Sequence, residues 1–315
     1  MAIVVPSRWG APPPPPSGRR SRRRTGWLQL AFISPWLIGF LAFSLFPLLV
    51  SLYWSFTSYG LFDAAPEWLG LKNYVYMFQH DDIFQKAVGN TVVYAVLSVP
   101  LLLVTALATA LALTQRIRGR GFWRTLFFLP SLAPPVATAL VFKAMFDPGA
   151  GAVNRILGAL GLPQPGWFAS SDTALFTLVL MSVWGFGGTM VIFLAGLQDV
   201  PPQLYEAAAL DGAGPIRKFW SITTPLISPV VLFNLILLVI GATQTFAQSL
   251  IVGGALGFPG GSTLLYNVYL YQTAFLPPGR LGYGAALAWV MLVALVLLTL
   301  LNLALSRRWV YYQED

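Results

Sequence analysis

Side chains that could do chemistry are scarce in this chain. Its 315 residues include no cysteine, a single histidine (His80) and only 10% charged residues. Without cysteine there is no disulfide framework, thiol nucleophile or Cys-ligated metal. One histidine leaves an intramembrane metalloprotease without its ligands and a serine protease without its base. We therefore expect no enzyme. Four charged residues, Glu206, Asp211, Arg217 and Lys218, lie in one polar stretch between two long apolar segments, Glu206–Pro229, with the sequence EAAALDGAGPIRKFWSITTPLISP.

This charged stretch is predicted to form a helical hairpin. Pro201-Pro202 precede it and suit a helix start, so a first helix is expected over about Gln203 to Leu210. Asp211-Gly212 favours a turn, and a second helix is expected to begin near Pro215. A polar hairpin between two long apolar segments offers a surface that another protein can bind.

The rest of the chain has the composition of an integral membrane protein. It is 57% hydrophobic with a mean hydropathy of +0.69, and its charged fraction is far below the roughly 25% of soluble domains. Spanning a bilayer takes about 20 apolar residues. Six segments qualify: Trp27–Tyr53, Thr91–Leu113, Phe122–Phe146, Thr173–Leu197, Leu226–Val252 and Gly282–Leu305. We predict an all-α polytopic protein of six transmembrane helices, with the hairpin between helices four and five.

Prolines are expected to interrupt two of these spans. Pro35 and Pro47 fall in the first, and Pro130, Pro134 and Pro135 fall in the third. Each proline removes a backbone donor and crowds the preceding turn, which kinks or breaks a helix.

Lysine and arginine are distributed unevenly among the loops. With the N-terminus inside, fourteen of the 19 lie on the inner side: Arg8, Arg19, Arg20, Arg22, Arg23, Arg24, Arg116, Arg118, Arg120, Arg124, Arg217, Lys218, Arg307 and Arg308. This excess predicts cytoplasmic termini and a cytoplasmic hairpin, and it explains the net charge of +8 without a nucleic-acid partner. We divide the chain into a disordered basic, proline-rich tail (1–26), a membrane domain (27–306, with the hairpin loop 201–229) and a C-terminal tail (307–315).

No energy source is evident within the chain. The sequence has no GxxxxGK[ST] motif, so we expect no bound nucleotide. Carriers driven by ion gradients usually bury ionisable groups in their spans, and the central thirds of these spans have none. Lys143 and Asp147 lie near the outer end of the third span. Energy is therefore expected to enter from outside the chain, at the hairpin.

Uncharged polar and aromatic groups mark a candidate path for a solute. In the fifth span, Asn234, Gly241, Gln244, Thr245 and Gln248 recur at offsets of three, four and seven, which places them on one face of a continuous helix. Trp184 lies beside Gly185, Gly187 and Gly188, where the backbone can open or pack closely. Tyr266, Asn267 and Tyr271 precede the sixth span. Amides bind hydroxyls and aromatic faces pack on sugar rings, which favours a neutral polyol. The alternative for each residue is helix–helix hydrogen bonding or an interfacial aromatic.

The hairpin resembles the EAA signature of ATP-binding-cassette importer permeases. Ten positions match at the family's spacing: Glu206, Ala207, Ala208, Asp211, Gly212, Ala213, Phe219, Ile222, Pro225 and Pro229. Gly70–Tyr74, Asn90-Thr91 and Gly282–Ala286 are similar to segments of the sugar-type branch, which includes maltose, multiple-sugar and glycerol-phosphate importers. The resemblance covers most of residues 68–306.

The resemblance implies a permease subunit in a bacterial-type cytoplasmic (inner) membrane. Glu206, Ala207, Ala208, Asp211, Gly212 and Ala213 would form the coupling helix and turn that contact an ATPase. The implied partners are a second, related permease chain, two cytoplasmic ATPase subunits that carry ATP and Mg, and an extracytoplasmic solute-binding protein. The permease itself would bind no cofactor and form half of an alternating-access pathway.

Two alternatives remain open at this stage. Within the same machinery, the solute could be of the glycerol-phosphate type or another polar solute. From a different class, the chain could be a secondary carrier or channel without an ATPase, although the complete EAA signature and the absence of intramembrane charge argue against this.

Overall fold

The computed structural model describes residues 32–62, 65–115 and 117–311, and their regular structure is helical. Among these residues extended pairing is limited to an isolated antiparallel bridge between Thr57 and Trp68. The predicted all-α class is therefore confirmed. The predicted tail 1–26 and the ends of the predicted membrane domain and C-terminal tail at 27–31 and 312–315 lie outside the described residues.

The chain divides into two units, residues 1–51 and 52–315. Most of the first apolar helix, Phe32–Trp54, belongs to the first unit. Its α-helical pattern gives way to a π-helical turn at Leu41–Leu45, followed by α2, Phe46–Trp54. The interruption lies directly before Pro47, where the missing N–H removes an α-helical hydrogen bond. Pro35 lies in the regular helix before this turn.

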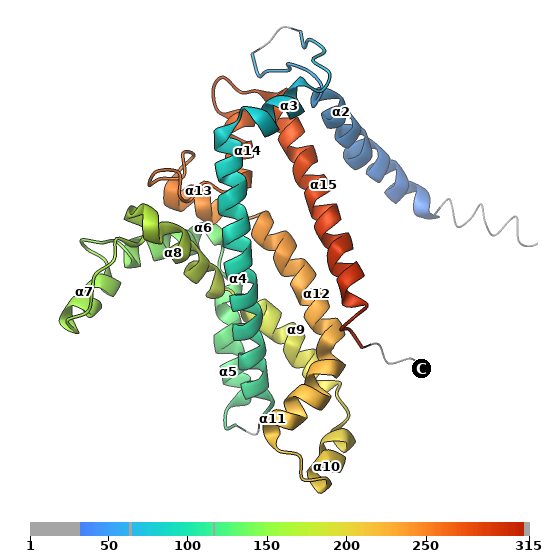
Figure 1. The fold of residues 1–315 in the computed structure, drawn as a ribbon, viewed down its shortest axis with the longest axis vertical. Coiled ribbons are helices and arrows are strands. Elements are labelled where there is room, and N and C mark those ends of the chain that lie inside the picture. The colour runs from blue at the N-terminus through green and yellow to red at the C-terminus, as the bar shows by residue number, and fades with distance from the viewer. Residues whose placement is uncertain (1–31, 63–64, 116, 312–315) are drawn as a thin grey trace, which may run out of the picture. The chain divides into compact units, whose positions relative to one another are not determined.

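The second unit contains the remaining helices (Figure 1). In chain order they are α3 (Lys72–Gln79), α4 (Asp82–Thr114), α5 (Arg120–Phe128), α6 (Pro135–Met145), α7 (Ala152–Ala159), α8 (Ser171–Val183), α9 (Gly187–Gln198), α10 (Pro202–Leu210), α11 (Pro215–Lys218), α12 (Thr224–Thr243), α13 (Ala247–Gly253), α14 (Tyr266–Phe275) and α15 (Leu281–Ser306). The long helix α4 packs against α8, α9, α12 and α14. It is the element around which the unit is assembled.

Within the described residues four helices are long and apolar enough to cross a membrane. They are Phe32–Trp54, Asp82–Thr114, Pro215–Gly253 and Leu281–Ser306. Two bent pairs raise the number to as many as six, at the positions predicted for the third and fourth spans.

The bends have different local causes. Arg120–Leu132 and Pro135–Met145 meet at 96°, after a 3-10 turn at Leu129–Leu132. Pro134 and Pro135 cannot donate the hydrogen bonds that would continue the helix, so the predicted interruption is confirmed. The helices over Ser171–Val183 and Gly187–Gln198 meet at 47°. The break between them lies beside Trp184, where neighbouring glycines predicted that the backbone can open.

Glycine allows close approach at this second bend. A Cβ on Gly187 would lie 2.4 Å from the Phe127 carbonyl oxygen, whereas a Cβ on Gly188 would meet nothing within 4 Å. A Cβ on Gly196 would lie 2.7 Å from a Val230 methyl group, which brings α9 directly against α12. These contacts join α5, α9 and α12.

Candidate functional site

The predicted hairpin is present. α10 begins at Pro202 and ends at Leu210, and α11 begins at Pro215. Gly212 has φ of +76°, a left-handed conformation that glycine adopts without strain. The Ala213 N–H donates to the Ala208 carbonyl at 2.8 Å and the Gly212 N–H donates to the Ala209 carbonyl at 3.1 Å. These two bonds form a Schellman motif, so the DGA sequence ends α10 and reverses the chain.

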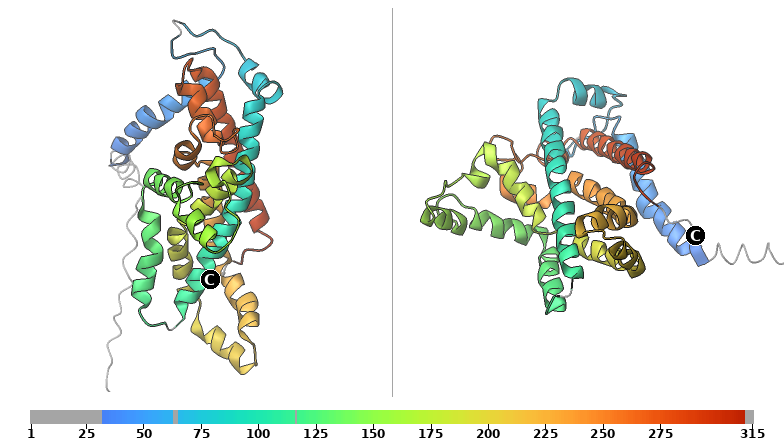
Figure 2. Two further views of the ribbon diagram at one scale, coloured as in Figure 1. Left: turned by 90° about the vertical axis from the view of Figure 1, so that its left-hand side faces the viewer. Right: turned by 60° about the horizontal axis from the view of Figure 1, so that its bottom comes forward.

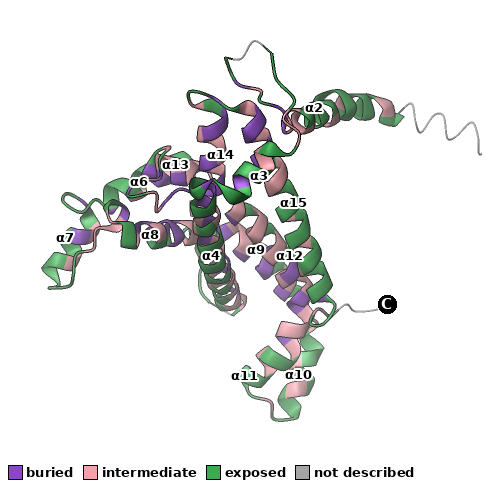
Figure 3. Ribbon diagram, turned by 45° about the horizontal axis from the view of Figure 1, so that its top comes forward, coloured by how far each residue is buried: buried purple, intermediate pink, exposed green. Residues whose placement is uncertain are grey.

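Neither α10 nor α11 contains a buried residue (Figure 3). Glu206, Ala207, Asp211 and Gly212 are exposed, and Ala208 and Ala213 are half-buried. Large apolar side chains beside them are also open: Leu210 is 91% exposed, Ile216 75% and Trp220 64%. An exposed surface that mixes apolar and charged groups in this way suits a protein partner.

The hairpin lies at one end of the second unit. α3 and α14 lie at the other end of α4 (Figure 1), and the turned view shows the hairpin at the same end (Figure 2). Its second arm runs without a gap through α11 and a π-helical turn, Phe219–Thr223, into α12. The hairpin is thus an extension of one of the long apolar helices.

The polar residues predicted to share one face of the fifth span are divided, because the helical segment Pro215–Gly253 is interrupted between α12 and α13. α12 ends at Thr243 and α13 begins at Ala247. Gln244 and Thr245 lie in the interruption and Gln248 lies in α13, so the one-face argument does not extend across it. Gly241 and Gln244 are exposed, and Thr245 and Gln248 are half-buried.

Two of the predicted path residues are occupied by internal contacts. Asn234 is 1% exposed, and its amide donates to the Val230 carbonyl one turn earlier at 3.0 Å. The Tyr266 hydroxyl donates to the Leu287 carbonyl at 2.8 Å, and its N–H donates to Thr91 Oγ1 at 2.8 Å. The bond of Asn234 lies within α12, whereas those of Tyr266 join α14 to α15 and α4.

The remaining aromatic and amide candidates lie nearer the surface. Trp184 is 54% exposed and makes an edge contact with Phe142. Asn267 and Tyr271 are half-buried, and Tyr271 makes an edge contact with Phe246.

A polar contact that the sequence did not suggest joins two helices to the interruption of the fifth span. The buried Tyr94 hydroxyl of α4 interacts with the side chains of Ser182, at the end of α8, and Thr245. One turn further along α4, Ser98 Oγ is buried without a hydrogen-bond partner. Tyr94 lies within an apolar run, so its neighbours become evident only in three dimensions.

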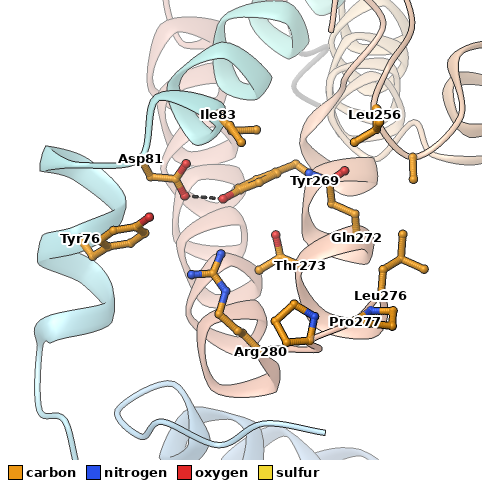
Figure 4. A pocket seen from close by; sticks show the side chains of 12 residues that line it. Tyr76, Asp81, Ile83, Leu256, Tyr269, Gln272, Thr273, Leu276, Pro277 and Arg280 are labelled. Carbon is orange, nitrogen blue, oxygen red and sulfur yellow. Dashed lines mark hydrogen bonds between the residues drawn. The ribbon is translucent and has the colours of Figure 1, made fainter.

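A second polar cluster is centred on Asp81, the residue before α4. The start of α4 lies at the end opposite the hairpin (Figure 1), and Figure 4 shows the cluster from close by. Asp81 is 4% exposed and caps α4 by accepting from the Phe84 N–H at 2.9 Å. Its other oxygen accepts from the hydroxyls of Tyr269 and Tyr283. Burial, followed by the hydrogen bond to this carboxylate, raises the pKa of the Tyr269 phenol, which keeps it a neutral donor.

Arg280 completes this cluster. Its guanidinium lies 4.9 Å from the Tyr283 ring centre and 6.0 Å from that of Tyr76, and Figure 4 shows it reaching between Tyr76 and Tyr269. The cluster borders a cavity of about 370 Å³ that Gln272 and Thr273 also line. The cluster joins α3, α4, α14 and α15.

The match to known proteins covers most of the chain. Residues 103–311 match the family described as the binding-protein-dependent transport system inner membrane component. The chain belongs to this family. It is therefore the multi-pass inner-membrane permease component of such a system, in agreement with the resemblance of its hairpin.

Named relatives align over nearly the full permease. The "Probable ABC transporter permease protein YesP" of Bacillus subtilis (strain 168) is 42% identical, over 93% of this chain and 95% of the relative. The arabinooligosaccharides transport system permease protein AraP of the same organism is 30% identical, over 90% and 93%. The sn-glycerol-3-phosphate transport system permease protein UgpA of Yersinia pestis bv. Antiqua (strain Antiqua) is 32% identical, over 91% and 96%.

A solved structure shares the permease's fold. A chain from the crystal structure of a bacterial alginate ABC transporter, in complex with an alginate pentasaccharide-bound periplasmic protein, superimposes with a TM-score of 0.77 at 22% identity. The match covers 92% of this chain and 97% of that chain.

We predict that Asp81→Asn lowers the stability of the permease. Asparagine retains one side-chain acceptor oxygen for three donors, so at least one buried donor loses its partner, at a cost of about 2 kcal/mol. The matched control is Asp82→Asn, because Asp82 is exposed in the same turn and its effect should stay below about 1 kcal/mol. Thermal unfolding in detergent measures both, and equal midpoints for the two variants would contradict the structural role of Asp81.

Proposed function

We propose that this permease forms half of the membrane pathway of an importer for a sugar or similar neutral polar solute. The solute-binding protein delivers solute outside. ATP binding closes two cytoplasmic ATPase subunits, which carry the ATP and Mg, and their motion reaches the spans through the hairpin. A second, related permease chain supplies the other half of the pathway. The chain itself catalyses no reaction.

The exposed EAA hairpin is the observation that carries this proposal. Glu206, Ala207 and Ala208 lie on the short helix α10, which the Schellman motif terminates. Leu210 and Ile216 add exposed apolar surface. Small side chains allow a partner's backbone to approach closely. Because α11 continues into α12, a force applied to the hairpin acts directly on a long membrane helix.

The membrane topology that we propose has six spans and cytoplasmic termini. Each bent pair counts as one span, which fits the positions of the apolar segments. The excess of inner arginine and lysine supports a cytoplasmic hairpin. The separation of the hairpin from α3 and α14 along α4 (Figure 1) is consistent with this orientation.

The proposed solute path uses the accessible members of the predicted set. Trp184, Gly241 and Gln244 are exposed, and Thr245, Gln248, Asn267 and Tyr271 are half-buried. Together they provide amides and hydroxyls for hydrogen bonds, and aromatic rings for the apolar faces of a sugar. We leave Asn234 and Tyr266 out of the path, because Asn234 is buried with its amide N–H bonded within α12 and the Tyr266 hydroxyl is bonded to α15.

The names of the relatives favour a saccharide. They include permeases of transport systems for arabinooligosaccharides, lactose and diacetylchitobiose, and one for sn-glycerol 3-phosphate. The candidate path residues carry no charge, which is better suited to a neutral glycan than to a phosphate ester.

We predict that Gly212→Asp abolishes uptake although the permease still inserts in the membrane. Any side chain at φ +76° strains the left-handed turn, and the new charge lies on the proposed contact surface. Gly214→Asp is the matched control, because Gly214 has φ of −72° and precedes α11 as its N-cap, where aspartate is favoured. Glu206→Lys should also abolish uptake, by reversing the charge on the contact surface. Wild-type uptake in Gly212→Asp and Glu206→Lys would refute the coupling role.

For the solute path, we predict that Gln244→Ala slows uptake by about two- to tenfold, the factor expected for one lost hydrogen bond. Gln79→Ala is the control, since Gln79 is an exposed glutamine at the end of α3. Radiolabelled oligosaccharides and glycerol 3-phosphate, tested first on the wild-type importer, serve as probes. Unchanged rates in both Gln244→Ala and a Gln244→Ala/Gln248→Ala double variant would remove these amides from the path.

A further inference from the structure

The side chain of Tyr205 attaches α10 to the rest of the described permease. Although no residue of α10 is buried, the half-buried ring of Tyr205 packs against a core cluster of α4, α9 and α12 that includes Phe193 and Ile227. Apart from Ala208, which is also half-buried, the other residues of α10 are exposed (Figure 3). Tyr205 immediately precedes Glu206, the first residue of the EAA signature.

The hydroxyl of Tyr205 also makes a hydrogen bond across the hairpin. It lies 2.9 Å from Thr223 Oγ1, and Thr223 is 4% exposed. Among the described residues this is the one side-chain hydrogen bond between α10 and another helix. The bond bypasses the turn at Gly212 and joins the first arm of the hairpin directly to the start of α12.

Thr223 lies at the position from which a displacement of the hairpin would be transmitted to α12. It ends the π-helical turn Phe219–Thr223, and such turns inside long helices are frequently found at functional sites. Directly beyond it, α12 packs against α4 and α9, with Val230 in close contact with Gly196. A motion delivered to Thr223 therefore reaches two other long helices without crossing a loose contact.

We propose that the Tyr205–Thr223 hydroxyl pair is the strut that makes the coupling hairpin and the base of α12 move as one body. This inference rests on the proposed function and assigns positioning roles to two residues within it. The ring of Tyr205 provides the packing, whereas its hydroxyl fixes the angle between α10 and α12. Without the hydroxyl, α10 tilts against α12, and closure of the ATPase is transmitted incompletely.

The test uses the assembled complex of this permease with its second permease, ATPase subunits and binding protein, in lipid vesicles. Tyr205→Phe and Thr223→Val remove one hydroxyl each, whereas Thr223→Ser keeps it. We expect the first two variants to retain the ATPase but to lower the stimulation of ATP hydrolysis by the binding protein about three- to tenfold, as for one lost hydrogen bond. Thr223→Ser should remain close to wild type. The double variant should be no worse than either single variant, because both remove the same bond.

A distance measurement between α10 and α12 tests directly whether the hydroxyl pair fixes the angle between these helices. The natural chain has no cysteine, so spin labels on Ala209→Cys in α10 and Phe233→Cys in α12, both at exposed positions, report the angle between the helices. The wild-type background should give one narrow distance with and without ATP, and Tyr205→Phe should broaden it.

The outcomes separate the strut from the function on which it rests. Wild-type stimulation and a narrow distance in Tyr205→Phe would overturn the strut alone, as would equal damage from Thr223→Ser and Thr223→Val. Failure of the wild-type chain to retain the ATPase would overturn the importer function and the strut with it.

Discussion

The packing of α12 against α4 and α9 is the contact on which the rest of the permease depends. The hairpin is an extension of α12, and α4 extends from that packing to the cluster at Asp81. Gly196 lets α9 approach Val230 closely, so displacement of α12 cannot be absorbed by a gap. A close-packed protein interior transmits strain rather than dissipating it. The fold thus links a polar hairpin at one end to a polar cluster at the other.

Polar groups within the long helices are mostly satisfied locally. The hydroxyls of Thr105, Thr109 and Thr299 each donate to a carbonyl four residues earlier, which avoids unpaired groups in lipid. Two polar contacts between elements fall instead at an interruption and at a helix end, namely those of Thr245 and Asp81. These are the places where backbone regularity is already lost and where a change of conformation disturbs the fewest helical hydrogen bonds.

Local chemistry decided how much could be predicted from the sequence. The hairpin was predicted to within one residue at the start of α10, because a proline pair and an Asp-Gly turn act over a few residues. The prolines of the third span predicted an interruption but not its 96° angle, which depends on what the two halves pack against. The prediction that the polar residues of the fifth span share one face assumed a continuous helix. No proline or Asp-Gly pair marks the interruption at 244–246. Asp81 binds tyrosines 188 and 202 residues later in the chain, so its role has no local signal beyond a helix cap.

The central claim is that energy enters this permease through its hairpin, and copurification tests it most directly. The wild-type chain, expressed with its candidate ATPase and second permease and extracted in detergent, should retain the ATPase at a fixed ratio, and addition of the binding protein should stimulate ATP hydrolysis. If the chain purifies without an ATPase, and uptake in cells follows an ion gradient while ignoring ATP depletion, the account is contradicted and the chain is a carrier.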